Sequence, residues 1–249
     1  MANPIFASEN YVAASGVIIN VSSGDTYKER LYDQNPVLQW TSYGETVEAS
    51  GCISYAEVVF PEATTFDTVV LQNINLKQFK IQQYDGANYQ DIAELTYTVN
   101  ALTSIYKKLT SPITTTKVKI LMQSTITSNQ EKKIGQFWAL DETFELTEGK
   151  HTHSRADYKE GGSYYLASGK LETFTLFKKY ASKIDFSQLK LASITSLKSI
   201  YDTDSNFTFI LNYDDNVDGI WNVCWMGKFN YEEDTIRRFF KLSMELNEQ

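Results

Sequence analysis

The sequence predicts an all-β protein built from two domains. Its 249 residues suit two ordinary β domains, or one large one. The chain contains 16 Tyr, 14 Phe and 4 Trp, and aromatic side chains pack well on a pleated sheet. Short strand-like segments recur between turn residues, and only one segment has a helical period, so we expect a sandwich or jelly roll followed by a smaller β-rich domain.

The first half consists of short strand-forming segments separated by turns. Pro61 should end the segment 52–60, because proline cannot donate a hydrogen bond to a β-ladder. Asp85-Gly86 follows the segment 79–84 and is a strong signal for a tight turn between two strands. The expected strands are 17–21, 37–40, 52–60, 66–71, 79–84, 95–99, 104–109, 116–122 and 134–140.

A polar stretch separates the two halves. Residues 141–162 are rich in Glu, Lys, His, Asp and Gly, a composition typical of connecting segments. We therefore expect a first domain over residues 1–145, a linker over residues 146–162 and a second domain over residues 163–249.

The second half is expected to be β-rich with one short helix. Ile194, Leu197, Ile200 and Tyr201 recur at steps of three and four residues within 186–201, which predicts a helix there, with Ser193 as a candidate N-cap. The expected strands are 164–166, 171–177, 207–211, 221–225 and 237–246.

Four segments of the first half, 35–42, 66–76, 79–86 and 133–140, resemble the discoidin, or coagulation-factor C-type, family. The likeness is greatest to the divergent form found in phage virion proteins, and it implies a jelly roll without a catalytic motif. The second half resembles the small β modules of phage tail proteins, through an aromatic strand, a short helix, a Trp-rich strand and a last strand that ends in a leucine-glutamate stretch. Together these resemblances imply a tail or baseplate component.

Asn75 follows a strand expected to be buried, within the segment that carries the resemblance. Its amide is placed to bond loose backbone groups at the turn. A ligand contact is the alternative role.

Charge and targeting signals exclude several function classes. The net charge of −8 disfavours electrostatic binding of nucleic acid. No apolar run approaches the roughly 20 residues that a membrane helix needs, and no secretory signal is visible at the N-terminus. Cys52 and Cys224 have no metal-ligand spacing and are expected to be two buried free thiols, so we expect a soluble protein made in a reducing cytoplasm.

The sequence offers no specific catalytic or metal motif. His151 and His153 would face one side of an extended chain, and Asp157 is a candidate third metal ligand, but exposed loop histidines are the favoured interpretation. The acidic stretches 202–204 and 214–218 are candidate Ca²⁺ ligands, with solvated turns favoured. We therefore expect no cofactor, no bound metal and no enzymatic activity.

Aromatic side chains near turns and strand ends are the candidate contact residues. A tyrosine ring can stack on a sugar face or contribute to a subunit interface, and interfaces are enriched in aromatic residues. Assembly is favoured over sugar binding. The candidates are Tyr43, Tyr84, Tyr89 and Tyr106, with Tyr164 and Tyr165 as further tyrosines of this kind.

The function expected is that of a structural protein of a bacteriophage virion, acting by protein–protein contacts in a tail or baseplate. It would be made in the cytoplasm of the host bacterium and would bind other virion proteins and further copies of itself. The alternative is a carbohydrate-binding module that recognises a glycan of the host surface. Neither function requires nucleic-acid binding or insertion into a membrane.

Overall fold

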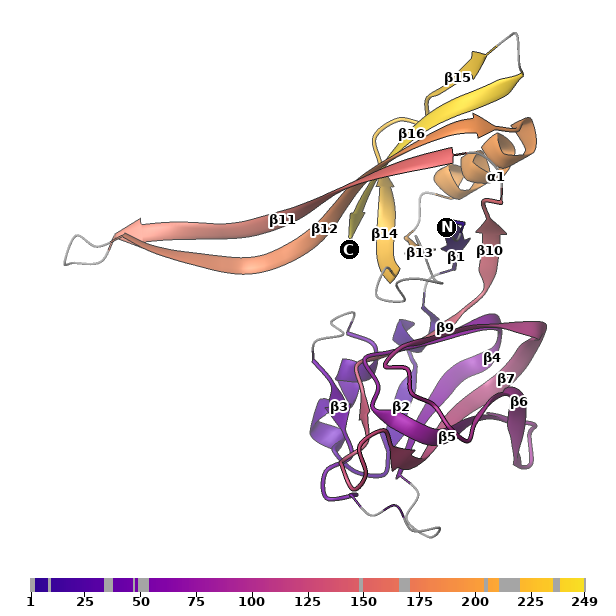
Figure 1. Ribbon diagram of the computed structural model, residues 1–249, viewed down its shortest axis with the longest axis vertical. Helices are drawn as coiled ribbons and strands as arrows, with labels where there is room; N and C mark the ends of the chain where they lie inside the picture. Colours follow the sequence, from indigo (N-terminus) through magenta and orange to yellow (C-terminus); the bar gives the residue numbers. More distant parts are fainter. Residues whose placement is uncertain are drawn as a thin grey trace. The chain divides into compact units, whose positions relative to one another are not determined.

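The structure is a computed structural model that describes residues 3–8, 10–33, 38–46, 48, 54–147, 150–165, 171–203, 206–210, 220–234 and 238–248. It confirms the predicted all-β class, with one α-helix among the described residues. The chain divides into two compact units, coloured by sequence in Figure 1. Unit 1 comprises residues 1–2, 6–143 and 210–220, and unit 2 comprises residues 3–5, 144–209 and 221–249.

Unit 1 is a sandwich built around two long antiparallel strands, β4 (Ser54–Gln72) and β7 (Ile105–Thr125). The order of the main sheet is β2-β4-β7-β5-β6, and β9 also pairs with β4. Near its start β4 pairs with β2, whereas near its end it pairs with β9. The remaining elements of this unit are η1 (Tyr11–Ala13), β2 (Ile18–Val21), η2 (Asp25–Leu31), β3 (Trp40–Thr41), β5 (Leu76–Tyr84), β6 (Tyr89–Tyr97), β8 (Lys133–Ile134) and β9 (Gln136–Leu140).

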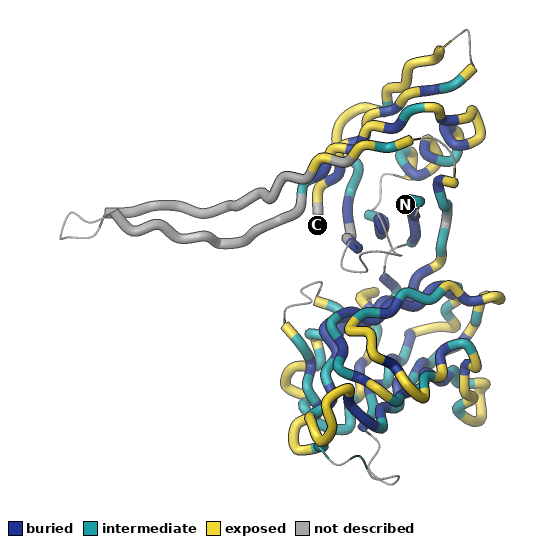
Figure 2. Tube along the Cα trace, in the orientation of Figure 1, coloured by how far each residue is buried: buried dark blue, intermediate teal, exposed yellow. Residues whose placement is uncertain are grey.

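The core of unit 1 follows from the alternation of its strands. Along the first part of β4, buried residues alternate with half-buried ones, as expected when one face of a sheet covers a core. Figure 2 colours the chain trace by burial and shows buried and half-buried stretches in unit 1. The largest buried side chains include Trp40, Phe66, Phe79 and Phe137.

The sequence predicted more strand ends in unit 1 than the structure has. β4 continues through Pro61, so the strands expected at 52–60 and 66–71 are one strand in the described residues. The register of β4 and β7 shifts between Val59 and Thr64, so Pro61 lies where the regular ladder is interrupted and its missing donor costs little. β7 likewise joins the expected strands 104–109 and 116–122.

The expected turn at Asp85-Gly86 is confirmed by the β5–β6 hairpin. The Asp85 carboxylate accepts hydrogen bonds from the backbone N–H groups of Ala87 (2.9 Å) and Asn88 (2.7 Å). Gly86 has a φ of 99°, a conformation that glycine adopts without the steric cost of a side chain.

An eight-stranded sheet of order β10-β1-β13-β14-β16-β12-β11, with β15 paired to β16, makes up most of unit 2. Four of its strands, β1, β10, β13 and β14, have end residues that are counted with unit 1. Helix α1 follows β12 along the chain. The elements are β1 (Ile5–Ala7), β10 (Glu142–Glu145), β11 (Lys150–Tyr165), β12 (Leu171–Leu189), α1 (Leu191–Asp202), β13 (Phe207–Ile210), β14 (Ile220–Met226), β15 (Tyr231–Asp234) and β16 (Phe239–Glu248).

A long strand replaces the expected linker. Lys150–Tyr165 forms β11, which pairs along its whole length with β12. The linker expected at 146–162 is therefore wrong for the described residues from Lys150 onward. Polar composition predicted a connection, but cross-strand pairing holds these polar residues in a hairpin, which Figure 1 shows extending from the sheet.

The helix begins later than expected. α1 starts at Leu191, and Lys190 occupies the N-cap position without a side-chain cap bond, so Ser193 is a buried helical residue rather than the cap. Phe186, expected at the helix start, belongs to β12 and is buried against its strand neighbours. No helix among the described residues has the length and apolar character needed to cross a bilayer.

Candidate functional site

Two exposed tyrosines lie together in unit 1, next to the buried Trp40. The Tyr43 side chain is 51% exposed and that of Tyr27 is 38% exposed. Their ring centroids are 6.1 Å apart, with the planes tilted by 51°. The guanidinium carbon of Arg30 lies 4.1 Å from the centre of the Tyr27 ring, a cation–π contact. We call Tyr27, Arg30 and Tyr43 the Tyr27–Tyr43 patch.

A tightly packed glycine fixes the patch to the strand β3. Gly24 has a φ of 70°, and a Cβ atom at this position would lie 2.3 Å from the carbonyl oxygen of Thr41. Only glycine therefore fits between Tyr43 and β3 without displacing backbone. The indole N–H of Trp40 donates a hydrogen bond at 3.2 Å to the carbonyl of Ser23, the residue before Gly24, and this bond also ties the Gly24 loop to β3.

Polar groups support the loop that carries Tyr43. The Ser42 N–H donates to the Lys132 carbonyl, and the Lys132 N–H donates to the Ser42 hydroxyl, both at 2.9 Å. The Gly44 N–H donates to the Glu131 carboxylate at 2.9 Å, and Ser22 donates to the Glu45 carboxylate at 2.8 Å. Carboxylates and a guanidinium thus lie in the segments that position the exposed Tyr43 ring. Such a set of groups suits a polar ligand that also has an apolar face.

Tyr84 and Tyr89 also lie together, on the outer face of the β5–β6 hairpin. Their ring centroids are 5.4 Å apart. The Lys117 ammonium lies 4.8 Å from the Tyr84 ring centre, and the Lys119 ammonium lies 3.8 Å from that of Tyr89. The Tyr84 hydroxyl donates to the Gly86 carbonyl at 2.9 Å. Both tyrosine rings therefore already make contacts with other residues of unit 1.

Glu57 is the centre of the polar network beneath Tyr89. Tyr89 and Asn20 donate hydrogen bonds to its carboxylate, and Lys119 forms an ion pair with it at 3.1 Å. Burial raises the pKa of Glu57, but these hydrogen bonds and the Lys119 charge outweigh burial and leave the pKa below its ordinary value. Burial and the Glu57 contact in turn raise the pKa of Tyr89. The network therefore favours a charged carboxylate and a neutral phenol.

Tyr106 lies in a third place, beside Glu142 at the start of β10. Its hydroxyl donates to the Glu142 carboxylate at 3.3 Å, and Lys108 pairs with the same carboxylate at 2.7 Å. The structure thus brings Tyr84 and Tyr89 together, and it places Tyr43 with Tyr27 rather than with another of the expected tyrosines. The side chains of Tyr164 and Tyr165 lie outside the described parts of the chain.

The sequence did not single out Tyr27 and Arg30. They are three residues apart within η2, whose backbone is kinked at Tyr27, and this short separation brings the guanidinium over the ring. That spacing is the signal that identifies the pair, although it does not reveal the approach of Tyr43, which comes from a different segment.

Asn75 has the structural role expected of it. Its amide donates to the Glu131 carbonyl at 2.8 Å and accepts from the Lys133 N–H at 2.8 Å. Glu131 precedes β8 and Lys133 is its first residue, so one side chain ties this segment to the start of β5. This prediction is confirmed.

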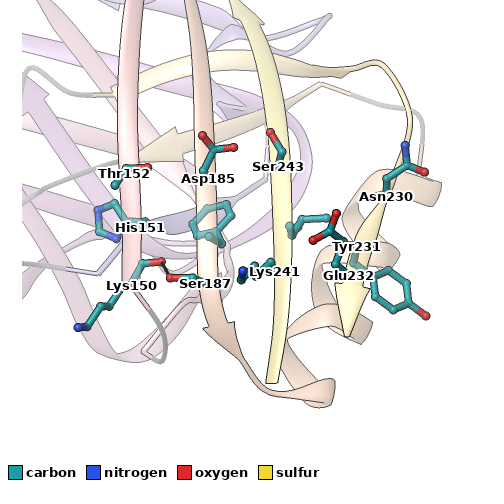
Figure 3. A pocket seen from close by; sticks show the side chains of 12 residues that line it. Lys150, His151, Thr152, Asp185, Ser187, Asn230, Tyr231, Glu232, Lys241 and Ser243 are labelled. Carbon is teal, nitrogen blue, oxygen red and sulfur yellow. Dashed lines mark hydrogen bonds between the residues drawn. The ribbon is translucent and has the colours of Figure 1, made fainter. Parts of the chain in front are cut away.

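Unit 2 contains an open pocket of about 510 Å³ on its sheet, drawn in Figure 3. His151, Phe186, Leu242 and Tyr231 are register neighbours across β11, β12, β16 and β15, and Figure 3 shows the lining side chains spread over these four strands. Burial lowers the pKa of His151. The pocket's acidic and basic lining residues are Lys150, His151, Asp185, Glu232 and Lys241.

The other expected ligand residues can be placed only in part. His151 lies in β11, not in a loop, and the side chains of His153 and Asp157 are outside the described part of the structure. Among the described residues, no group of three His, Cys, Asp or Glu side chains is arranged to hold a metal ion. Residues 204 and 214–218 of the acidic stretches also lie outside the described ranges, as does Cys52, whereas Cys224 is half-buried and its thiol donates to the Asn247 carbonyl at 3.7 Å.

Comparison with known proteins finds solved structures with a similar fold but no matching family. No protein-family model matches the chain, and no curated protein matches its sequence. Among solved structures, CpGH89CBM32-6 from Clostridium perfringens is 15% identical, with a TM-score of 0.44 over 53% of this chain and 98% of that chain. A chitosan-binding module from Paenibacillus sp. IK-5 is 16% identical, with the same TM-score and the same shares covered. The family 32 carbohydrate-binding module of C. perfringens NanJ, solved with galactose, is 14% identical, with a TM-score of 0.43 over 55% of this chain and 99% of that chain.

Proposed function

We propose that the protein is a non-catalytic carbohydrate-binding protein whose site is the Tyr27–Tyr43 patch. The observation that carries this proposal is the half-exposed Tyr43 ring, held beside Tyr27 and Arg30 on a tightly packed loop. Among the described residues, no hydrogen bond to the Tyr43 hydroxyl is present. The three other expected tyrosines use their hydroxyls within unit 1.

The chemistry of the patch matches that of a sugar. A tyrosine gives a large contact area at low conformational cost, because its ring has only two side-chain torsions to fix. Arg30 can donate to sugar hydroxyls, and the Glu131 and Glu45 carboxylates can accept from them. The ligand class proposed is a glycan of a cell surface, with the apolar face of one ring unit lying on Tyr43.

A glycan array with the full-length protein tests this function, followed by calorimetric titration of any glycan that binds. Tyr43→Ala should weaken binding about tenfold or more, which corresponds to about 1.4 kcal/mol. Tyr231→Ala is the matched control, because Tyr231 is 50% exposed but belongs to unit 2, and this change should leave the affinity unaltered. Absence of binding on the array, or equal loss in both variants, would contradict the proposal.

A second candidate function is assembly into a bacteriophage tail or baseplate. The β11–β12 hairpin supports it, since β11 is an end strand of its sheet and is 16 residues long. Long edge strands are templates for pairing with another chain. This function predicts that the purified protein forms oligomers of fixed size and that it is present in virions. A protein that is monomeric at high concentration and missing from virions would exclude it.

A further inference from the structure

The outer edge of β11 is unpaired along its whole length among the described strands. β11 ends the sheet order, and its single described partner is β12. Natural proteins usually keep edge strands short or cover them, because free N–H and C=O groups recruit further strands. The 16 residues of β11 are about three times the usual strand length.

Half of the hairpin also lacks a third strand. β12 pairs with β16 from Ala181 to Leu189. Beyond that point, Asp157–Tyr165 and Leu171–Tyr180 form a ribbon of two strands, with no third strand beside it among the described residues. An isolated two-stranded ribbon is at best marginally stable in water, so this part gains most from another strand.

The charge sequence of β11 is complementary to itself. Along a strand, the backbone N–H and C=O groups of successive residues point alternately to its two sides. In an antiparallel pair of copies, an even-numbered residue therefore lies opposite an even-numbered one, and an odd-numbered residue lies opposite an odd-numbered one. The twofold axis therefore passes through a residue. An axis at Tyr158 sets Asp157 opposite Lys159 twice, and opposite charges directly across a ladder are stabilising.

The neighbouring axes are less favourable. An axis at Asp157 sets Asp157 against its own copy and Arg155 against Lys159, which places like charges opposite each other. An axis at Ala156 pairs Arg155 with Asp157 but leaves the last residues of β11 without partners. The axis at Tyr158 lies at the middle of β11 and overlaps nearly the whole strand.

We propose that two copies of this chain pair through the free edge of β11, antiparallel, with the twofold axis at Tyr158. The occupant of the edge is thus a second copy of the same strand, and the two hairpins form one continuous four-stranded ribbon. The inference rests on the second candidate function, assembly, and is independent of sugar binding at the Tyr27–Tyr43 patch.

Sedimentation equilibrium of the full chain, with charge-exchange variants, tests the pairing. The wild type should be dimeric, whereas Asp157→Lys and Lys159→Asp should each weaken dimerisation at least tenfold, because each sets like charges opposite each other twice. The double variant D157K/K159D restores the opposite charges and should restore the dimer. Asp185→Lys and Lys183→Asp are matched controls for charge, since they lie on β12, whose two edges are both paired, and they should dimerise as the wild type does.

A crosslink tests the register. With Cys52 and Cys224 replaced by Ser, Tyr158→Cys should form a disulfide dimer, since directly opposed Cα atoms lie about 4.5–5.5 Å apart. Ser154→Cys should not, because its copy would lie eight residues away along the ladder, about 27 Å. A monomeric wild type would overturn this inference, and it would overturn the assembly function as well only if the protein were also missing from virions. A dimer that is insensitive to Asp157 and Lys159, or that crosslinks equally at both positions, would overturn the β11 pairing alone.

Discussion

At the scale of single residues, Asn75 is the side chain whose removal tests the packing of unit 1 most directly. Asn75→Ala removes two hydrogen bonds, to the Glu131 carbonyl and from the Lys133 N–H. Leaving partly buried backbone groups unsatisfied should lower the free energy of unfolding by about 1–3 kcal/mol. Asn20→Ala is the control, since it removes one exposed hydrogen bond to Glu57 and should cost under about 0.5 kcal/mol. Urea unfolding measures both, and equal losses would show that Asn75 has no special role.

Glu57 should give the protein an acid-sensitive component of stability. Because the net pKa of Glu57 is lowered in the folded state, its stabilisation is present above the ordinary pKa of 4.5 and is lost as the pH falls through the folded value. The difference in unfolding free energy between the wild type and Glu57→Gln should therefore shrink as the pH falls from 7 to 3. Glu62→Gln, on an exposed position of the same strand, is the control. A difference that does not change with pH would contradict the network.

Alanine substitutions at Gly24 and Gly44 distinguish the cost of backbone strain from the cost of steric overlap at the Tyr27–Tyr43 patch. Both have positive φ values, so alanine costs roughly 1–2 kcal/mol at either position. At Gly24 the new Cβ would also lie 2.3 Å from the Thr41 oxygen, whereas at Gly44 it would meet nothing within 4 Å. Gly24→Ala should therefore lower the free energy of unfolding by about 1–3 kcal/mol more than Gly44→Ala. Thermal unfolding of the two variants checks this, and similar losses would show that the loop can move away from β3.

At the scale of elements, the hairpin β11–β12 should consist of two parts that differ in stability. At low protein concentration, amides of the two-stranded part, 157–165 and 171–180, should exchange with solvent faster than those of 181–189, which lie between two strands. At high concentration the amides of β11 should become protected if its edge pairs with a second copy. Hydrogen exchange at several concentrations measures this, and uniform protection at low concentration would count against a marginal ribbon.

The elements predicted from sequence are those whose signals are local. Asp85-Gly86 specifies its own turn, and Asn75 bonds to groups that every turn leaves exposed, so both follow from residue type and position. β11 was missed because its polar residues and Gly161-Gly162 match a connection, and only the long-range partner β12 makes them a strand. The Tyr27–Tyr43 patch was predicted only in part, because tertiary packing brings its residues together. Tyr43 lies near a turn in the sequence and was a candidate, whereas its neighbour Tyr27 belongs to a different segment.

At the scale of the whole molecule, the first half of the chain begins and ends with a strand of the eight-stranded sheet. β1 and β10 are neighbours in that sheet, although most of unit 1 lies between them in sequence. The Ser8 N–H donates to the Asp141 carbonyl at 2.9 Å, and the Leu146 N–H donates to the Pro4 carbonyl at 2.9 Å. A cut near residue 145 therefore removes two strands from the sheet, so residues 146–249 are not expected to fold alone.

A deletion that keeps both strands should preserve this sheet. Because Ser8 and Asp141 are hydrogen-bonded neighbours, residues 9–140 can be replaced by a short Gly-rich linker without separating β1 from β10. We expect this shortened chain to give dispersed amide signals in NMR spectra and a cooperative thermal transition, and residues 146–249 to give neither. In the shortened chain, Ile5→Ala should lower the free energy of unfolding by about 2–5 kcal/mol, because Ile5 in β1 is buried and belongs to unit 2. If residues 146–249 folded as well as the shortened chain, β1 and β10 would be dispensable, and the second half would be an independent domain after all.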